Sequence, residues 1–210
     1  MQAEEEMALA NTDNSLVDYG QALNNAASFE QAMKMSTFLS KSLFIPKEFQ
    51  NKPADCLIAL QMAGNLGVSP FEVMKGIYIV HGKPAFSSQF AIGLANLRGP
   101  FESNISFETT GTGAEMTVYA EATLKKTGKK VKASFSMQQA IDAGWAGRNP
   151  NYKAIPEQML SYKSAMMLIR KTCPEILMGM RTIEELSDHK PQHENEAIKT
   201  MQKKVEGSVK

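Results

Sequence analysis

The clearest pattern of apolar and polar positions lies between residues 116 and 125. Every second position from 116 to 124 is apolar, and the positions between them carry Thr, Tyr, Glu and Thr. This alternation is typical of a strand that buries one face. Shorter alternations at 105–109 and 131–135 flank it, separated by the turn sequences GTGA and KKTGKK. The pattern predicts a three-stranded antiparallel meander over residues 105–135.

Helical patterns occupy most of the remaining chain. Pro156 opens the longest helix and Pro174 ends it, because proline is tolerated in the first turn of a helix and not in its interior. Pro53 and Gly67 bracket another helix in the same way, with glycine as the C-terminal cap. Serines at 28, 87 or 88, and 136 are expected to act as N-caps. The predicted helices are 28–43, 53–67, 69–75, 87–97, a short one from 136, and 156–172.

A second strand pair is expected before the meander. Residues 77–80 read Ile-Tyr-Ile-Val, the sequence His81-Gly82-Lys83 turns the chain, and residues 84–86 return. We therefore predict an α+β fold in which the meander and this β-hairpin pack against helices, including one long helix in the C-terminal half. The predicted organisation is an acidic, mobile N-terminal segment (1–27), a single domain (28–187) and a polar tail (188–210).

The net charge of +1 hides an uneven distribution. Residues 1–30 carry six acidic and no basic side chains, whereas residues 121–171 carry ten basic and three acidic ones. A basic block of this kind favours an anionic partner. No apolar run approaches the roughly 20 residues of a membrane span, and the acidic N-terminus is unlike a secretory signal. We expect a cytoplasmic protein, with Cys56 and Cys173 reduced and buried.

Two groups of cations are candidates for holding phosphate. The first surrounds the turn of the meander and includes Lys129 and Lys132; a solvated hairpin tip is the alternative reading. The second lies on the long helix, where Lys163 and Arg170 are seven residues apart and so nearly superposed along the axis. We expect both to lie opposite the core side of the helix, although an ordinary amphipathic helix gives the same pattern.

The loop before the long helix adds to this second group. Arg148, Tyr152 and Lys153 lie just upstream of the helix, and an aromatic side chain beside cations can stack a nucleic-acid base. We expect Tyr152 to be more exposed than Trp145, which we assign to the core or to a subunit contact.

Catalytic signatures do not accompany these cations. The chain contains neither GxxxxGK[ST] nor GxSxG. His81, His189 and His193 lack metal-ligand spacing, and Glu121 has no paired acid on its strand. We therefore predict no catalytic residue, no metal and no cofactor. Two alternatives stay open, a metal-dependent nuclease that uses Glu121 and a non-catalytic protein-interaction module.

Two long segments and a short motif resemble the RecT/Red beta family of phage single-strand annealing proteins. The segments are ALQMAGNLGVSPFEVMKGIYIVHGKPAFSSQFAIGLAN and AGWAGRNPNYKAIPEQMLSYKSAMMLIRKTCPEILMGM, followed by TIEEL, and together they span about residues 54–186. The resemblance implies ATP-independent binding of single-stranded DNA and annealing of complementary strands in phage-type recombination. It also implies oligomeric rings or helical filaments that hold DNA in a basic groove.

The resemblance also implies site residues and partners. Phosphate contacts are expected at Lys163 and Arg170, and further DNA contacts at Lys75, Lys83, Tyr152 and Lys153; family members often have tryptophan at the Tyr152 position. With the cations named above, the expected DNA-binding set is Lys75, Lys83, Lys129, Lys132, Arg148, Tyr152, Lys153, Lys163, Arg170 and Lys171. The expected partners are single-stranded DNA, the annealed duplex intermediate, further copies of the chain, and a phage exonuclease or the host single-strand-binding protein.

Overall fold

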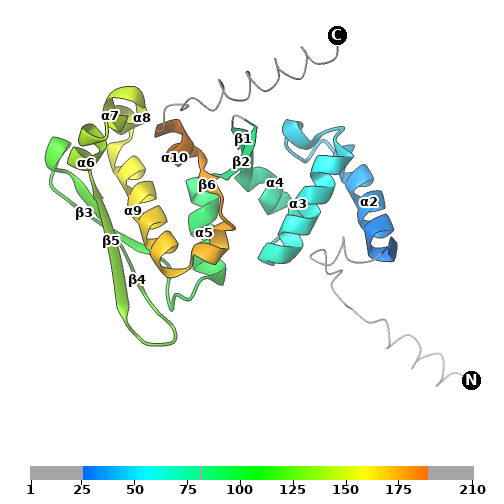
Figure 1. The fold of residues 1–210 in the computed structure, drawn as a ribbon, viewed down its shortest axis with the longest axis horizontal. Helices are drawn as coiled ribbons and strands as arrows, with labels where there is room; N and C mark the ends of the chain where they lie inside the picture. The colour runs from blue at the N-terminus through cyan, green and yellow to red at the C-terminus, as the bar shows by residue number, and fades with distance from the viewer. Residues whose placement is uncertain (1–25, 81, 189–210) are drawn as a thin grey trace, which may run out of the picture. The chain divides into compact units, whose positions relative to one another are not determined.

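The structure is a computed structural model that describes residues 26–80 and 82–188 of the 210-residue chain. It is a mixed α+β fold, as predicted (Figure 1). It contains two three-stranded sheets: the predicted meander, and a second sheet in which one further strand joins the predicted hairpin. The chain divides into two compact units, Met1–Lys75 and Gly76–Lys210. The sequence has no linker-like stretch at the boundary between the two units. Nearly all of the predicted acidic segment and polar tail, and His81 of the predicted turn, lie outside the described residues.

The first unit is helical. Its elements are α2 (Ala26–Ser40), the 3-10 helix η2 (Lys47–Phe49), α3 (Pro53–Leu66) and α4 (Pro70–Gly76), the last ending at the unit boundary. Pro53 begins α3, and Gly67 ends it with a φ of 63°, where its N–H donates to the carbonyls of Ala63 and Gly64. This left-handed cap confirms the helix bounds predicted from Pro53 and Gly67. The buried face of α3, which carries Cys56, packs against α2.

The second unit begins with a small mixed sheet. Strands β1 (Ile77–Val80) and β2 (Lys83–Phe86) pair antiparallel, which confirms the predicted hairpin. Strand β6 (Arg181–Thr182) adds to β2 in parallel, with Phe86 opposite Thr182. After β2, the hydroxyl of Ser87 accepts a hydrogen bond from the N–H of Phe90 and caps α5 (Ser88–Arg98). This sheet brings the end of the described chain beside its hairpin.

The meander forms the second sheet of this unit, in the order β3 (Ser106–Thr110), β4 (Thr117–Thr123) and β5 (Lys130–Ser136). The alternation is confirmed, because Val118, Ala120 and Ala122 are buried. The long helix α9 (Pro156–Thr172) packs on β4 and β5 (Figure 1). Met159 and Leu160 of α9 join Val118 and Phe135 in the core. The predicted long helix is therefore the element that covers the sheet.

Short elements complete the second unit. Ser136 caps α6 through a capping box with Gln139, as its position in the sequence predicted. Trp145 to Lys153, predicted as a loop, lies mostly within two one-turn helices. Cys173 follows α9 and is buried with a free thiol, as is Cys56. These elements are α6 (Met137–Asp142), α7 (Trp145–Arg148), α8 (Asn151–Ala154), the 3-10 helices η3 (Gly113–Glu115) and η4 (Pro174–Leu177), and α10 (Ile183–Asp188).

Candidate nucleic-acid interface

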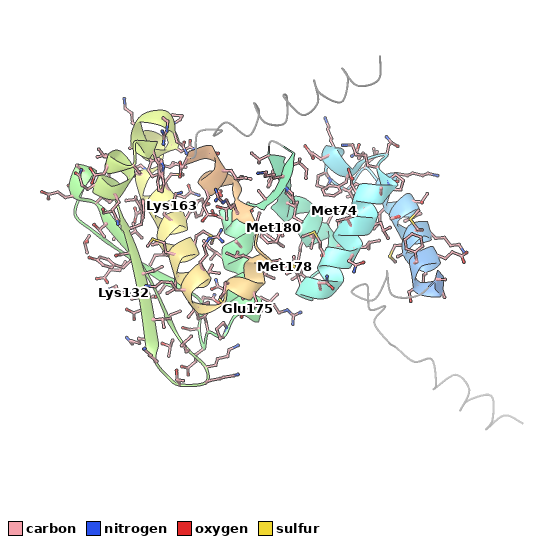
Figure 2. All side chains as sticks on the ribbon, in the orientation of Figure 1. Met74, Lys132, Lys163, Glu175, Met178 and Met180 are labelled. Carbon is pink, nitrogen blue, oxygen red and sulfur yellow. The ribbon has the colours of Figure 1, made fainter. Side chains whose placement is uncertain are left out.

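Lys163 lies in the interior of the second unit. It is 7% exposed, and its Nζ is 2.5 Å from Oδ2 of Asp188, the last residue of α10. The same ammonium lies over the ring of Trp145, 4.2 Å from the centroid. Figure 2 shows Lys163 on the upper part of α9. A lysine in this position forms a buried ion pair between α9 and α10.

Asp188 is the centre of a hydrogen-bond network. It is fully buried, and it accepts hydrogen bonds from the hydroxyl of Tyr152 at 3.0 Å and from Nδ2 of Asn149 at 3.1 Å. Its backbone carbonyl accepts from Nη2 of Arg148 at 3.1 Å. Both carboxylate oxygens are thus paired, as a buried charge requires. The network links the segment before α9, which contains α7 and α8, to α9 and α10.

The network changes the acidity of Tyr152. Burial raises the pKa of its phenol above the ordinary value, and the charge and hydrogen bond of Asp188 raise that pKa further. The phenol therefore stays protonated and continues to donate to the carboxylate.

Arg170 is held by a second carboxylate of the same short helix. Its Nε and Nη2 donate to the two oxygens of Glu185 at 3.1 and 2.6 Å, and Nη2 also donates to the carbonyl of Met180 at 3.2 Å. Burial alone would raise the pKa of Glu185. Hydrogen bonds from Arg170 and from the N–H of Thr182 outweigh that effect and hold the pKa below its ordinary value. This two-pronged ion pair fixes the start of α10.

These positions correct two expectations. Lys163 does not lie on a solvated face of α9, because Asp188 neutralises it inside the protein. Tyr152 is 3% exposed and therefore more buried than Trp145, which is half-buried and stacked on Phe135 at 5.8 Å between ring centroids. The cause of both errors is Asp188, which the sequence analysis assigned to the polar tail. Its carboxylate gives Lys163 and Tyr152 a partner in the interior.

The other candidates have exposed side chains, some of which are already engaged. Lys132 lies 3.5 Å from Glu108 and 4.2 Å from the ring centroid of Tyr119, on the face of the meander that α9 does not cover. In the first unit, Lys75 lies over the ring of Phe71 at 5.4 Å. Arg148 is anchored to the carbonyls of Ala143 and Asp188. Lys83, Lys129, Lys153 and Lys171 are also exposed.

One exposed cation beside these was missed by the sequence analysis. Arg181 of the edge strand β6 is opposite Ala85 in the register of β6 and β2, so it lies close to Lys83 on the neighbouring central strand. A two-residue strand has no alternation that a sequence pattern could reveal. The parallel pairing of β2 and β6 brings these two residues, far apart in the sequence, close together.

The side chains of the candidate site are mostly cations, several of which are paired with acids. Among residues 26–80 and 82–188, no three His, Cys, Asp or Glu side chains lie close enough to hold a metal ion. Glu121, the acid of the nuclease alternative, forms an ion pair with Lys130 at 3.2 Å. Chemically, the arrangement can bind anions at its exposed lysines.

In the described part of the chain, none of the helices has the length and apolar character needed to cross a bilayer.

The resemblance to annealing proteins rests on the quoted segments alone. A scan against protein-family models finds no family that matches this chain, and a search of curated proteins finds no match.

Proposed function

We propose that this protein binds single-stranded DNA and anneals complementary strands without ATP, as a cytoplasmic, oligomeric protein of phage-type recombination. The observation that carries the proposal is a set of exposed lysines in the second unit without carboxylate partners among the described residues. They are Lys125, Lys126, Lys129, Lys153 and Lys171. Three of them share one turn, where their mutual repulsion favours a bound anion.

Backbone hydrogen bonds hold the base of the turn that carries Lys125, Lys126 and Lys129. The N–H of Leu124 donates to the carbonyl of Lys129, and the N–H of Lys125 donates to the carbonyl of Pro100. The backbone on both sides of the turn is therefore fixed, while the three ammonium groups remain in solvent. Such a group suits a phosphate chain, whose charges repeat regularly and carry no sequence information.

Lys163, Arg170 and Tyr152 take a supporting role in this proposal. Their charges and hydrogen bonds are directed at Asp188 and Glu185, so a phosphate would first have to replace those carboxylates. We propose that exposed cations make the first contacts with DNA, whereas Lys163, Arg170 and Tyr152 stabilise the fold that carries those cations.

The proposed mechanism requires no bond to be made or broken by the protein. Electrostatic capture extends one strand, and Watson–Crick pairing with a second strand supplies specificity. Weak contacts repeated over several copies add by avidity. We also propose that a phage exonuclease or the host single-strand-binding protein acts as a partner in the same recombination pathway.

A binding and annealing assay tests the proposal. A labelled oligonucleotide is titrated with full-length protein at two salt concentrations, and duplex formation with its complement is followed without nucleotide. We expect binding that weakens with salt and annealing faster than in buffer. The variant Lys125→Ala, Lys126→Ala, Lys129→Ala should weaken both. Absence of binding in dilute buffer would overturn the proposal.

A matched control has the same loss of charge elsewhere. Lys34, Lys41 and Lys47 are exposed lysines of the first unit, and Lys34 is already paired with Glu30 at 2.7 Å. Their triple alanine variant should retain binding and annealing. End-labelled substrate in the same assay with Mg²⁺ or Mn²⁺ would show shortened products if the nuclease alternative were correct.

A further inference from the structure

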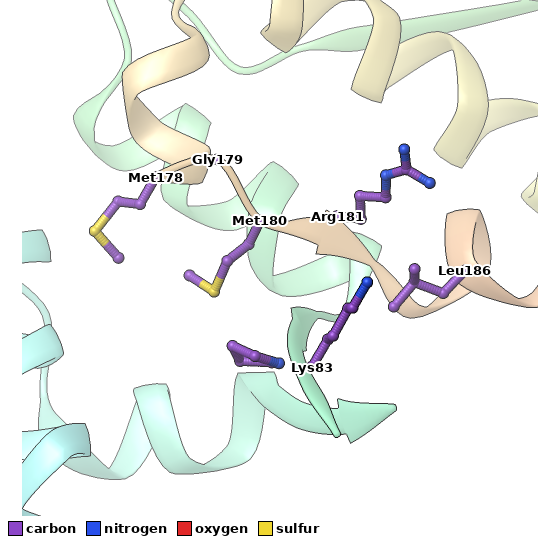
Figure 3. A pocket seen from close by; sticks show the side chains of 7 residues that line it. Lys83, Met178, Gly179, Met180, Arg181 and Leu186 are labelled. Carbon is purple, nitrogen blue, oxygen red and sulfur yellow. The ribbon is translucent and has the colours of Figure 1, made fainter. Parts of the chain in front are cut away.

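A pocket of about 370 Å³ lies in the second unit between β2, β6 and α10. Its lining is shown in Figure 3, with Met178 and Met180 towards one end and Lys83, Arg181 and Leu186 towards the other. Pro84 and Gly179 complete it. Met178 is 39% exposed and has a φ of 46°, an unusual conformation for a residue other than glycine. The pocket thus combines two cations with two flexible thioether side chains.

This lining selects for a ligand that is both acidic and apolar. Lys83 and Arg181 attract carboxylates or phosphates, while methionine side chains adapt to apolar groups of different shapes. None of the lining residues is aromatic, so the pocket does not provide the stacking surface that holds a nucleic-acid base. An acidic peptide with an apolar side chain fits this chemistry better than a nucleotide.

The chain itself contains such a peptide. Residues 1–25 carry five acidic and no basic side chains, and Glu4, Glu5 and Glu6 are followed at once by Met7 and then by Leu9. A segment of 25 residues can extend up to about 80 Å, which is enough to reach a neighbouring molecule. The proposed DNA function leaves this acidic segment without a role.

We propose that residues 4–9 of one copy dock in the pocket of Lys83, Met178, Met180 and Arg181 on a second copy. The glutamates pair with Lys83 and Arg181, and Met7 and Leu9 pack against the two methionines. Such a contact joins different surfaces of the two copies, so it repeats head to tail and grows with protein concentration. The proposal does not depend on DNA binding.

Peptide binding tests the pocket directly. A labelled peptide of residues 1–12 is titrated by fluorescence anisotropy into the full-length variant Glu4→Gln, Glu5→Gln, Glu6→Gln, whose own segment competes less. Combining this variant with Lys83→Ala and Arg181→Ala should weaken binding about tenfold, a change consistent with the loss of two exposed ion pairs. As a control, the glutamine variant is combined with Lys125→Ala and Lys126→Ala in place of the two pocket substitutions. This control removes the same charge from another surface and should leave peptide binding nearly unchanged.

Sedimentation velocity tests whether the contact joins two copies. The average mass of the wild-type chain should rise with concentration at low salt. The glutamine variant and the Lys83→Ala, Arg181→Ala variant should each reduce that rise, and their combination should reduce it no further. Unchanged circular dichroism would show that the variants are folded.

Three results would overturn the proposal. In the first, the peptide binds equally well after loss of the pocket cations. In the second, the peptide binds but the wild-type mass does not change with concentration, which would place the segment in its own pocket. In the third, the pocket variants lose affinity for an oligonucleotide and not for the peptide, which would assign Lys83 and Arg181 to DNA.

Discussion

The ammonium of Lys163 lies 2.5 Å from the buried carboxylate of Asp188, so the long helix α9 and the short helix α10 share a buried ion pair. Tyr152 and Asn149 donate to the same carboxylate from the segment before α9. One acid therefore sets the position of three separate elements. For the residues around Lys163, two roles must therefore be distinguished: support of the fold and direct contact with a ligand.

We expect Lys163→Ala to destabilise the protein strongly. The substitution leaves Asp188 buried without its cation, and breaking a buried pair in this way typically costs about 3–5 kcal/mol. The measurement is the free energy of unfolding in urea, followed by the fluorescence of Trp145, the single tryptophan. Lys153→Ala removes an exposed lysine close by and should change the free energy by less than about 0.5 kcal/mol.

A second substitution distinguishes the ion pair from packing. If the cost of Lys163→Ala arises from the unpaired charge, then adding Asp188→Asn should recover part of the lost stability, because the remaining side chain is neutral. A double variant as unstable as the sum of the two single variants would show that the pair is not coupled.

The ion pair of Arg170 and Glu185 predicts a pH dependence. The pKa of Glu185 is lowered from its ordinary value of 4.5, so the folded state favours the charged carboxylate. Its contribution to stability is fully present above about pH 4.5 and is lost as the pH falls through the lower, folded-state value. Glu185→Gln should therefore cost about 1.5–3 kcal/mol at pH 7, the range for a hydrogen bond to a charged group, and nothing in strong acid.

Melting temperatures between pH 2 and 7 measure this effect. The wild-type and Glu185→Gln curves should converge as the pH falls, while a control variant at the exposed Glu102 should run parallel to the wild type. Curves that stay equally far apart down to pH 2 would show that the charge of Glu185 is not responsible.

Tyr152 predicts a different behaviour in base. Its pKa is raised above the ordinary value of 10.0, so the folded state keeps the phenol neutral while the unfolded chain would ionise it. The stability that this adds is present below about pH 10 and falls as the pH rises beyond it. Tyr152→Phe should cost about 1–2 kcal/mol at pH 7 through the lost hydrogen bond, and its stability should decline less steeply above pH 10.

Tyrosinate absorbance provides the check. Of the five tyrosines, Tyr152 should not ionise while the protein is folded. The wild-type and Tyr152→Phe titrations should therefore coincide near pH 11 and separate by one tyrosine only on unfolding. A difference of one tyrosine in the folded proteins would contradict the buried position of this phenol.

The exposed lysines predict a change in salt dependence. Each phosphate contact on a single strand contributes about 0.7 to the slope of log affinity against log salt, so the triple variant of Lys125, Lys126 and Lys129 should lower the slope by about 2. Equilibrium binding of an unstructured oligonucleotide at four or five salt concentrations measures the slope. If affinity falls and the slope does not, the lysines act on the shape of the turn instead of on phosphates.

Local patterns were sufficient to predict most elements of the fold. The alternation around Val118, the prolines that open α3 and α9, and the serine caps at 87 and 136 are each encoded within a few neighbouring residues. Strand β6 and the role of α10 were not predictable in this way. They arise from contacts of Arg181 with β2 and of Asp188 with α9, between segments distant in the chain.

The candidate site was harder to predict than the fold, because it also depends on contacts between segments distant in the chain. A lysine and an arginine seven residues apart were correctly placed on one helix, but their spacing contains no information about which side a later segment covers. Glu185 lies within the quoted TIEEL motif, and its acids were the available signal that those cations have internal partners. Desolvation favours such pairing, because a charge taken from water needs a compensating charge close by.

The fluorescence of Trp145 can show whether Lys163 contacts DNA. This ring is 4.2 Å from the Lys163 ammonium and stacks on Phe135, so its emission responds to any departure of the lysine. If exposed lysines make the DNA contacts, a saturating oligonucleotide should leave the emission spectrum nearly unchanged, whereas Asp188→Asn should shift it without DNA. A shift on DNA binding equal to that of Asp188→Asn would instead mean that phosphate replaces Asp188 and that the interior cations are contacts after all.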